Sequence, residues 1–170
     1  MFKKGDCIVY GSTGICEVLD VTTMDMKGIP NDKLYYILQP YHKKGSEIFA
    51  PVDNKKTVIR SIISREDAKK LLEEVTSLEE FKIPNEKFRE DCYKQCVREC
   101  NSREIMKMIK MLHLRKHDRL VHGKNFPSTD ERYLKIAEEN LFSELALVLE
   151  IEKNRIKEYV SQKVNTCVVV

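Results

Sequence analysis

The stretch FKKGDCIVYGSTGICEV, residues 2–18, decides the fold of the first part of the chain. It holds one short apolar run at residues 7–10 and the start of another at residues 15–19, and neither is long enough for a helix of ordinary length. Gly11 and Gly14 lie between them and can take the backbone angles that a tight turn requires. The stretch therefore predicts two short strands separated by a turn.

The same alternation of apolar runs and turn residues continues to residue 62. Further short runs occupy residues 34–38, 48–52 and 58–60. Five short strands at this spacing predict a small, strongly bent antiparallel β-barrel of the Tudor or SH3-like type over residues 1–62. A core of about sixty residues is marginal, so we expect this part to depend on the rest of the chain or on a partner.

The remainder of the chain has a helical pattern, with apolar residues three and four positions apart. Ser64 and Ser102 stand where they could cap helices, and STDE at residues 128–131 has the form of a capping box. These signals predict an all-α helical bundle over residues 63–165. The expected class is therefore α+β, with the barrel over residues 1–62 as the first of two domains.

Composition limits the classes of function. The chain is 42% hydrophobic and 34% charged, as in a globular protein, and its net charge is only +3. Any nucleic-acid surface must therefore come from local clusters of Lys and Arg. No apolar run approaches the roughly 18 residues of a membrane span, and the first ten residues do not form a signal peptide. We expect a cytoplasmic protein with reduced thiols and no membrane partner.

No enzyme motif is present in the sequence. It lacks the G-x-x-x-x-G-K, G-x-G-x-x-G, H-E-x-x-H and G-x-S-x-G patterns that hold phosphates, dinucleotides, zinc or a nucleophilic serine. We therefore predict a binding protein without catalytic residues, cofactor, metal or small-molecule substrate.

Two stretches carry a family resemblance. Residues 2–18 follow the pattern F-x-x-G-D-x-[VI]-V-Y-x-x-x-G-x-x-x-V, which resembles the start of the CarD/CdnL family, whose first domain is shared with the transcription–repair coupling factor. Residues 101–112, 128–131 and 141–146 are similar, in order, to the family's helical domain. The resemblance spans roughly residues 1–150. It implies a bacterial transcription regulator whose barrel binds the β subunit of RNA polymerase. It also implies that the helical domain contacts promoter DNA, without sequence specificity, at the upstream edge of the bubble and modulates open-complex stability.

The resemblance implies a polymerase-facing surface on the barrel. Its candidate residues are Met24, Ile48, Phe49 and Pro51. Some relatives carry arginines where this chain has Met24 and Phe49, so the contact is expected to be more apolar here. Ile48 and Phe49 are expected to form a strand edge that pairs with the polymerase by sheet extension.

The candidate DNA surface depends on a basic stretch. Residues 103–124 contain seven Lys and Arg against two Asp and Glu, and such a helix face can neutralise phosphates. A solvated helix face is the alternative interpretation. The candidate DNA-binding residues are Phe88, Arg89, Arg103, Lys107, Lys110, Arg115, Lys116 and Arg119.

The chain departs from the family at the aromatic wedge. Family members usually carry a Trp near the start of the second C-terminal helix, but this chain has none. The equivalent position falls near Glu86, and Phe88 is the nearest aromatic. A Phe could wedge against a base step more weakly than Trp, whereas a Glu could not.

Three cysteines leave a further possibility open. Cys92, Cys96 and Cys100 are spaced four residues apart on a predicted helix. They could bind a soft metal or oxidise as a sensor, or they could pack as small apolar residues in a helix seam. Two alternatives to the DNA-binding regulator thus remain, a polymerase-binding adaptor without DNA binding and a cysteine-based sensor. The sign of regulation also stays open.

Overall fold

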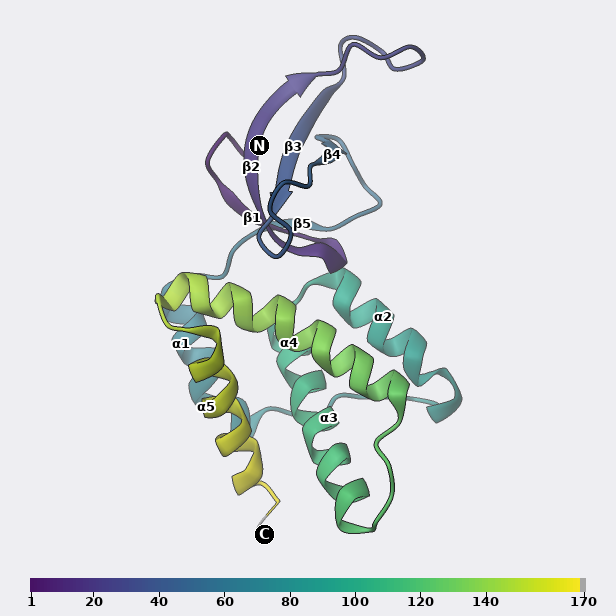
Figure 1. Cartoon of the computed structure of the whole chain (residues 1–170), viewed down its shortest axis with the longest axis vertical. Helices are drawn as coiled ribbons and strands as arrows, with labels where there is room; N and C mark the ends of the chain where they lie inside the picture. The colour runs from purple at the N-terminus through teal and green to yellow at the C-terminus, as the bar shows by residue number, and fades with distance from the viewer. Residues whose placement is uncertain (169–170) are drawn as a thin grey trace. The chain divides into compact units, whose positions relative to one another are not determined.

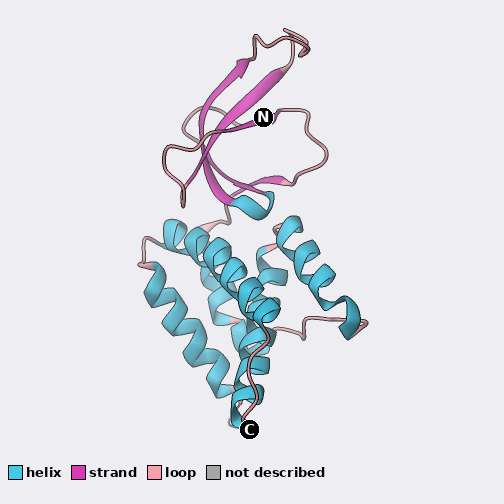
Figure 2. Ribbon diagram, turned by 45° about the vertical axis from the view of Figure 1, so that its right-hand side comes forward, coloured by secondary structure: helices cyan, strands magenta, loops and turns pink. Residues whose placement is uncertain are grey.

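The computed structural model describes residues 1–168 of the chain (Figure 1). These residues form two compact units, Met1–Ile62 and a second unit that begins at Ile63. The first unit is built of strands and the second of helices (Figure 2). The predicted α+β chain of two parts is therefore confirmed.

The first unit contains one five-stranded antiparallel sheet. Its strands are β1 (Cys7–Tyr10), β2 (Gly14–Thr23), β3 (Leu34–Pro40), β4 (Ile48–Pro51) and β5 (Ile59–Ser61). The strand order is β4-β3-β2-β1-β5, so β4 and β5 are the two edges. The described sheet is not closed, so the predicted bent barrel and its Tudor or SH3-like form stay unconfirmed. Edge strands of four and three residues offer few backbone groups with which to close it.

Two features bend this small sheet around its core. Gly11 and Gly14 join β1 to β2 with φ angles of 46° and 83°, which favour glycine. A Cβ on Gly11 would also lie 2.6 Å from Thr57 Cγ2, so the turn leaves no room for a side chain. The register of β2 against β3 shifts between Val18 and Asp20, which bends the longest strand. The core beneath consists of Ile8, Cys16, Val18, Tyr36, Leu38 and Ala50.

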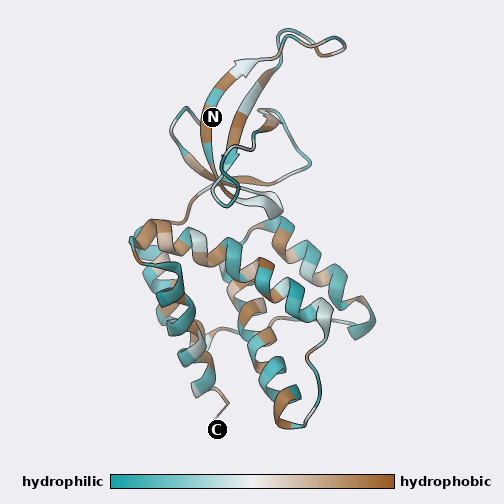
Figure 3. Ribbon diagram, viewed as in Figure 1, coloured by the Kyte–Doolittle hydropathy of each residue, from teal (hydrophilic) through white to brown (hydrophobic). Residues whose placement is uncertain are grey.

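The second unit is a bundle of five α-helices. They are α1 (Arg65–Glu73), α2 (Arg89–Glu99), α3 (Ser102–Val121), α4 (Ser128–Leu149) and α5 (Lys153–Thr166), with short 3-10 turns η2 (Val75–Ser77) and η3 (Glu86–Phe88) between α1 and α2. The central helix is α4, which contacts each of the other four. Apolar and polar residues alternate along the helices (Figure 3) and the apolar ones form one continuous core.

The helix starts differ in part from the predicted caps. Ser64 caps α1 as predicted, since its Oγ accepts the Asp67 N–H at 3.1 Å. The predicted Ser102 cap is wrong, because Asn101 precedes the helix and its Oδ1 accepts the N–H groups of residues 103 and 104. The predicted capping box is wrong as well. Pro127 occupies the capping position, no side chain caps α4, and the Pro127 carbonyl accepts the Glu131 N–H at 3.0 Å.

Within residues 1–168, none of the helices has both the length and the apolar character needed to cross a membrane.

Candidate functional site

The outer edge of β4 is the first candidate surface. Val52 N–H bonds to the Leu34 carbonyl at 3.0 Å just beyond β4. Backbone groups in an antiparallel ladder alternate in direction, so the N–H and C=O of Phe49 point away from β3. Pro51, the next outward-facing residue, has no N–H to offer. The outer edge of β4 therefore presents one backbone N–H donor, that of Phe49. Pro51 beside it limits pairing with the strands of other proteins.

The side chains of β4 divide between its two faces. Phe49 is 47% exposed, and Pro51 is partly exposed on the same face. Ile48 lies on the opposite face and packs against the core with Ala50. Met24 is half-buried and follows the end of β2, two strands away from β4. The structure thus brings Phe49 and Pro51 together on one face and turns Ile48 inward.

The basic stretch of α3 is paired with carboxylates from other segments and, at Lys107, also from α3 itself. Arg103 bonds to Glu74, which follows α1. Lys107 Nζ lies 2.8 Å from Glu104 and 3.8 Å from Glu79, and Lys116 Nζ lies 3.2 Å from Glu131 on α4. Phosphates that approached these side chains would compete with carboxylates already bound.

Two candidate cations bind carbonyl oxygens instead. Lys110 Nζ donates to the carbonyls of Thr76 and Leu78 at 2.8 and 3.1 Å. Arg119 Nε donates to the Asn125 carbonyl at 2.8 Å. These bonds tie α3 to η2 and to the loop before α4, and within residues 1–168 neither side chain forms an ion pair.

The net charge of the helical unit is close to zero. Residues 63–170 carry 21 Lys and Arg against 20 Asp and Glu. The local excess of residues 103–124 is balanced by acids that lie far away in the sequence and close in the fold. A high DNA affinity from net charge alone is not expected of this unit.

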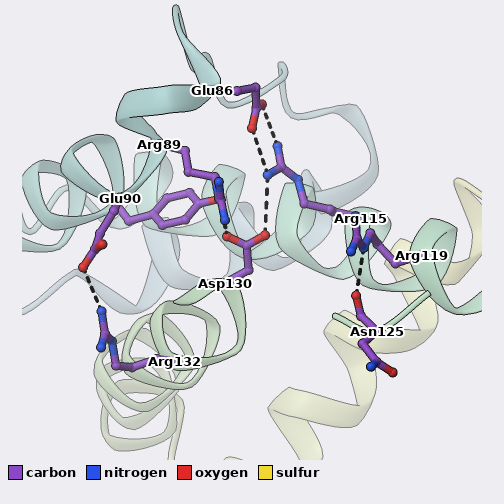
Figure 4. Close-up of polar contacts among 9 residues, drawn as sticks. Glu86, Arg89, Glu90, Arg115, Arg119, Asn125, Asp130 and Arg132 are labelled. Carbon is purple, nitrogen blue, oxygen red and sulfur yellow. Dashed lines mark hydrogen bonds and ion pairs between the residues drawn. The ribbon is translucent and has the colours of Figure 1, made fainter. Parts of the chain in front are cut away.

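A buried carboxylate, Asp130, holds the second group of candidates (Figure 4). Its side chain is 0% exposed, and its Oδ1 accepts bonds from Arg89 Nε at 3.0 Å and Tyr93 OH at 3.1 Å. Arg115 Nη1 lies 3.5 Å from Oδ2. Burial and the neighbouring carboxylate both raise the pKa of Tyr93, which therefore remains a proton donor. This cluster joins α2, α3 and α4, and the sequence analysis did not identify Asp130 because an acid in a first helix turn usually faces solvent.

The same cluster extends to the start of α2. Glu86 on η3 accepts two bonds from Arg115, at 2.9 Å and 3.3 Å. Phe88, two residues further on, is 52% exposed, and Lys87 Nζ lies 5.8 Å from the centre of its ring. The structure places Phe88 at the surface and turns Arg89 inward toward Asp130.

The three cysteines do not form one helical stripe. Helix α2 ends at Glu99, and Cys100 follows it in the left-handed region with a φ of 56°. Cys96 and Cys100 are buried and Cys92 is partly exposed. Among the described residues, no group of three His, Cys, Asp or Glu side chains could hold a metal ion. Burial, with a smaller effect from nearby acids, raises the pKa of Cys96 to about 12.

We expect Cys96 to resist thiol reagents in the folded protein. At pH 8 a thiol with a pKa of about 12 is ionised only to about one part in ten thousand, and the thiolate is the reactive form. Titration with a disulfide reagent should therefore modify Cys96 only after denaturant is added. Without denaturant, a Cys96→Ser variant should react with the same number of reagent equivalents as the wild type. Fewer equivalents for the variant would contradict the prediction, because they would show that Cys96 reacts in the folded protein.

A second buried acid, Glu138, links three helices. His113 Nε2 on α3 lies 2.7 Å from its Oε1, and Lys157 Nζ on α5 lies 3.5 Å from its Oε2. Burial alone would raise the pKa of Glu138, but these two partners outweigh it and hold the pKa below its ordinary value of 4.5.

This pKa shift predicts an acid-sensitive stability. Because ionised Glu138 is favoured in the folded state, its contribution is present above pH 4.5 and is lost as the pH falls through the folded-state pKa. Urea unfolding measured between pH 6 and pH 3 should show a falling free energy of unfolding. The slope should be shallower for Glu138→Gln and close to that of the wild type for Glu158→Gln, which alters an exposed acid on α5. Equal slopes for all three proteins would refute the assignment.

These two units define a class of protein in which a small sheet with an apolar edge strand is followed by a helical bundle. Among the described residues no metal site is found. Residues 2–63 match the family model of the CarD-like/TRCF RID domain. Residues 2–63 thus form a CarD-like domain of the kind that interacts with RNA polymerase, and the sequence resemblance is confirmed over these residues. No curated protein matches the chain.

Proposed function

We propose that the chain regulates transcription initiation by docking on the β subunit of RNA polymerase through the outer edge of β4. The observation that carries this proposal is Phe49, an exposed aromatic on an edge strand of a domain whose family interacts with polymerase. Its outward N–H and C=O could pair with a polymerase strand, while the ring fills an apolar pocket. Pro51 and Met24 would extend the apolar contact.

The proposal includes a weak contact of the helical unit with promoter DNA at the upstream edge of the bubble. The exposed ring of Phe88, with Lys87 beside it, supports this part. The positive charges of Lys110 and Arg119, whose bonds go to carbonyl oxygens, would add phosphate contacts. Docking on polymerase raises the effective concentration of this unit near DNA to the order of millimolar, so a low intrinsic affinity is sufficient. The contact would then change the lifetime of the open complex.

A specific observation favours a second candidate, a polymerase-bound adaptor that does not contact DNA. Arg103, Lys107 and Lys116 are all paired with carboxylates, and the helical unit is almost neutral. Such a protein would act by occupying its site on the polymerase.

One experiment separates these functions. The lifetime of open complexes formed by the cognate polymerase on a ribosomal RNA promoter would be measured after heparin challenge, with the wild-type chain and with Phe88→Ala. A wild-type change that is lost in Phe88→Ala supports DNA contact, and an equal change in both supports the adaptor. Failure of the wild-type chain to co-purify with polymerase would refute both.

A further inference from the structure

Arg115 lies between two carboxylates of different character. On its inner side is Asp130, which is 0% exposed and is shared with Arg89 and Tyr93. On its outer side is Glu86, which forms two bonds to the guanidinium. The Glu86 side chain is 64% exposed and the Arg115 side chain 25% exposed. One partner is thus fixed in the core and the other is held only at the surface.

The inner partner prepares Arg115 to bind an anion. A guanidinium offers several N–H donors in one plane and matches carboxylate and phosphate groups equally well. Asp130 Oδ2 lies 3.5 Å from Arg115 Nη1 without a hydrogen bond, and its buried charge attracts the guanidinium toward the core, so the side chain keeps an inner partner when an anion binds the outer edge. The charges of Arg89 and Arg115 exceed that of Asp130 by one, and Glu86 supplies the balance.

We propose that Arg115 is a phosphate-binding site that Glu86 masks in the free protein. The site takes a phosphodiester of the DNA backbone, which replaces the Glu86 carboxylate on the outer edge of the guanidinium. This inference rests on the proposed DNA contact. It adds that a DNA phosphate and the Glu86 carboxylate compete for the Arg115 guanidinium. The masking group and the ligand are both oxyanions, so one excludes the other by geometry as well as by charge.

The competition has a consequence for Phe88. Glu86 and Phe88 are the first and last residues of η3, a turn of three residues. Release of Glu86 removes the bonds that hold the first of these residues to α3, while Arg89 keeps the start of α2 anchored on Asp130. Phosphate binding at Arg115 thereby frees the turn that carries the exposed ring, which couples the backbone contact to the ring contact.

The chain contains a matched control for this site. Glu90 on α2 is also an exposed acid paired with an arginine, since Arg132 Nη2 lies 2.8 Å from its Oε1. The Arg132 side chain is 57% exposed and, within residues 1–168, pairs with Glu90 and with no buried acid; Glu90 also lies 3.5 Å from Lys94 Nζ. Glu86→Gln and Glu90→Gln change the net charge equally, so a difference between them reports on the site and not on overall charge.

The first test measures the affinity of the full chain for a labelled 20-base-pair duplex by fluorescence anisotropy at several salt concentrations. Glu86→Gln is expected to raise the affinity about tenfold at low salt and to steepen the salt dependence by about one phosphate contact. Glu90→Gln should change it by less than about threefold. In Glu86→Gln combined with Arg115→Lys, most of the gain should disappear, because lysine keeps the charge but cannot form two parallel bonds. Equal effects of Glu86→Gln and Glu90→Gln would overturn the proposal.

The second test does not depend on DNA. Inorganic phosphate would be titrated while the Nε–H resonances of the arginine side chains are followed by NMR. The Arg115 resonance should move at lower phosphate concentration in Glu86→Gln than in the wild type, and no such difference between the two proteins would overturn the masking. If this result holds while the wild-type chain leaves open complexes unchanged, the proposed function fails and the anion site stands.

Discussion

Phe49→Glu is expected to lower the affinity of the chain for RNA polymerase by about 30-fold or more. Aromatic side chains at the centre of an interface contribute on the order of 2 kcal/mol or more, and a buried unpaired carboxylate adds a desolvation cost. The ring is 47% exposed and contributes little to the core of the sheet, so the variant should fold as the wild type does. Affinity would be measured by biolayer interferometry with immobilised polymerase.

The opposite edge of the same sheet provides the control. Val58 is 41% exposed and lies just before β5, so Val58→Glu adds the same charge to a similarly exposed apolar position. Val58→Glu should leave the affinity within about threefold of the wild type, because an isolated exposed charge has a small effect. If Phe49→Glu binds as tightly as Val58→Glu does, β4 is not the docking edge.

Asp130→Asn is expected to have the largest effect on stability. Removal of one partner from a buried ion pair costs about 3–5 kcal/mol, because the remaining charges stay in the protein without compensation. We expect about 3 kcal/mol here, since Arg89 and Arg115 are partly solvated and Arg115 keeps its bonds to Glu86. Urea unfolding followed by the helical circular dichroism signal would measure this loss in the full chain.

An exposed pair of the same type provides the comparison. Glu90→Gln removes the partner of Arg132 at the surface and should cost less than about 1 kcal/mol. In Asp130→Asn the amide oxygen can still accept from Tyr93 and Arg89, but the amino group in the place of Oδ2 faces the Arg115 guanidinium, donor against donor. A loss of under 1 kcal/mol for Asp130→Asn would mean that the cluster does not stabilise the bundle.

Local signals predicted the secondary structure well. Short apolar runs separated by Gly and Pro became the five strands, and Ser64 caps α1 in the predicted way. The caps of α3 and α4 were missed because neighbouring residues compete for the same position. Asn101 accepts the N–H of Glu104, which a cap at Ser102 would also have used, and Pro127 begins α4 without a side-chain bond.

The candidate surfaces were predicted less completely. Phe49 was identified and is exposed, whereas Ile48, one residue away, faces the core. Alternation along a strand makes neighbours face opposite sides, but it does not tell which side is buried until the partner strands are known. An edge strand at Ile48 and Phe49 was expected and β4 is one, but the order of the other strands required the fold, since strand order is a property of pairings between distant residues.

By itself, the sequence determined the class of fold, the strand and helix segments and the family of the first domain, because propensity, turn chemistry and a contiguous motif are all local in the chain. Only the tertiary structure decided which charges remain available. The cations of α3 form salt bridges with Glu74, Glu86 and Asp130, which lie 15 to 30 positions away in the sequence. No local sequence pattern reveals pairs at such a separation. Electrostatic attraction depends on distance in space, so a basic stretch in the sequence became a largely compensated face in the fold.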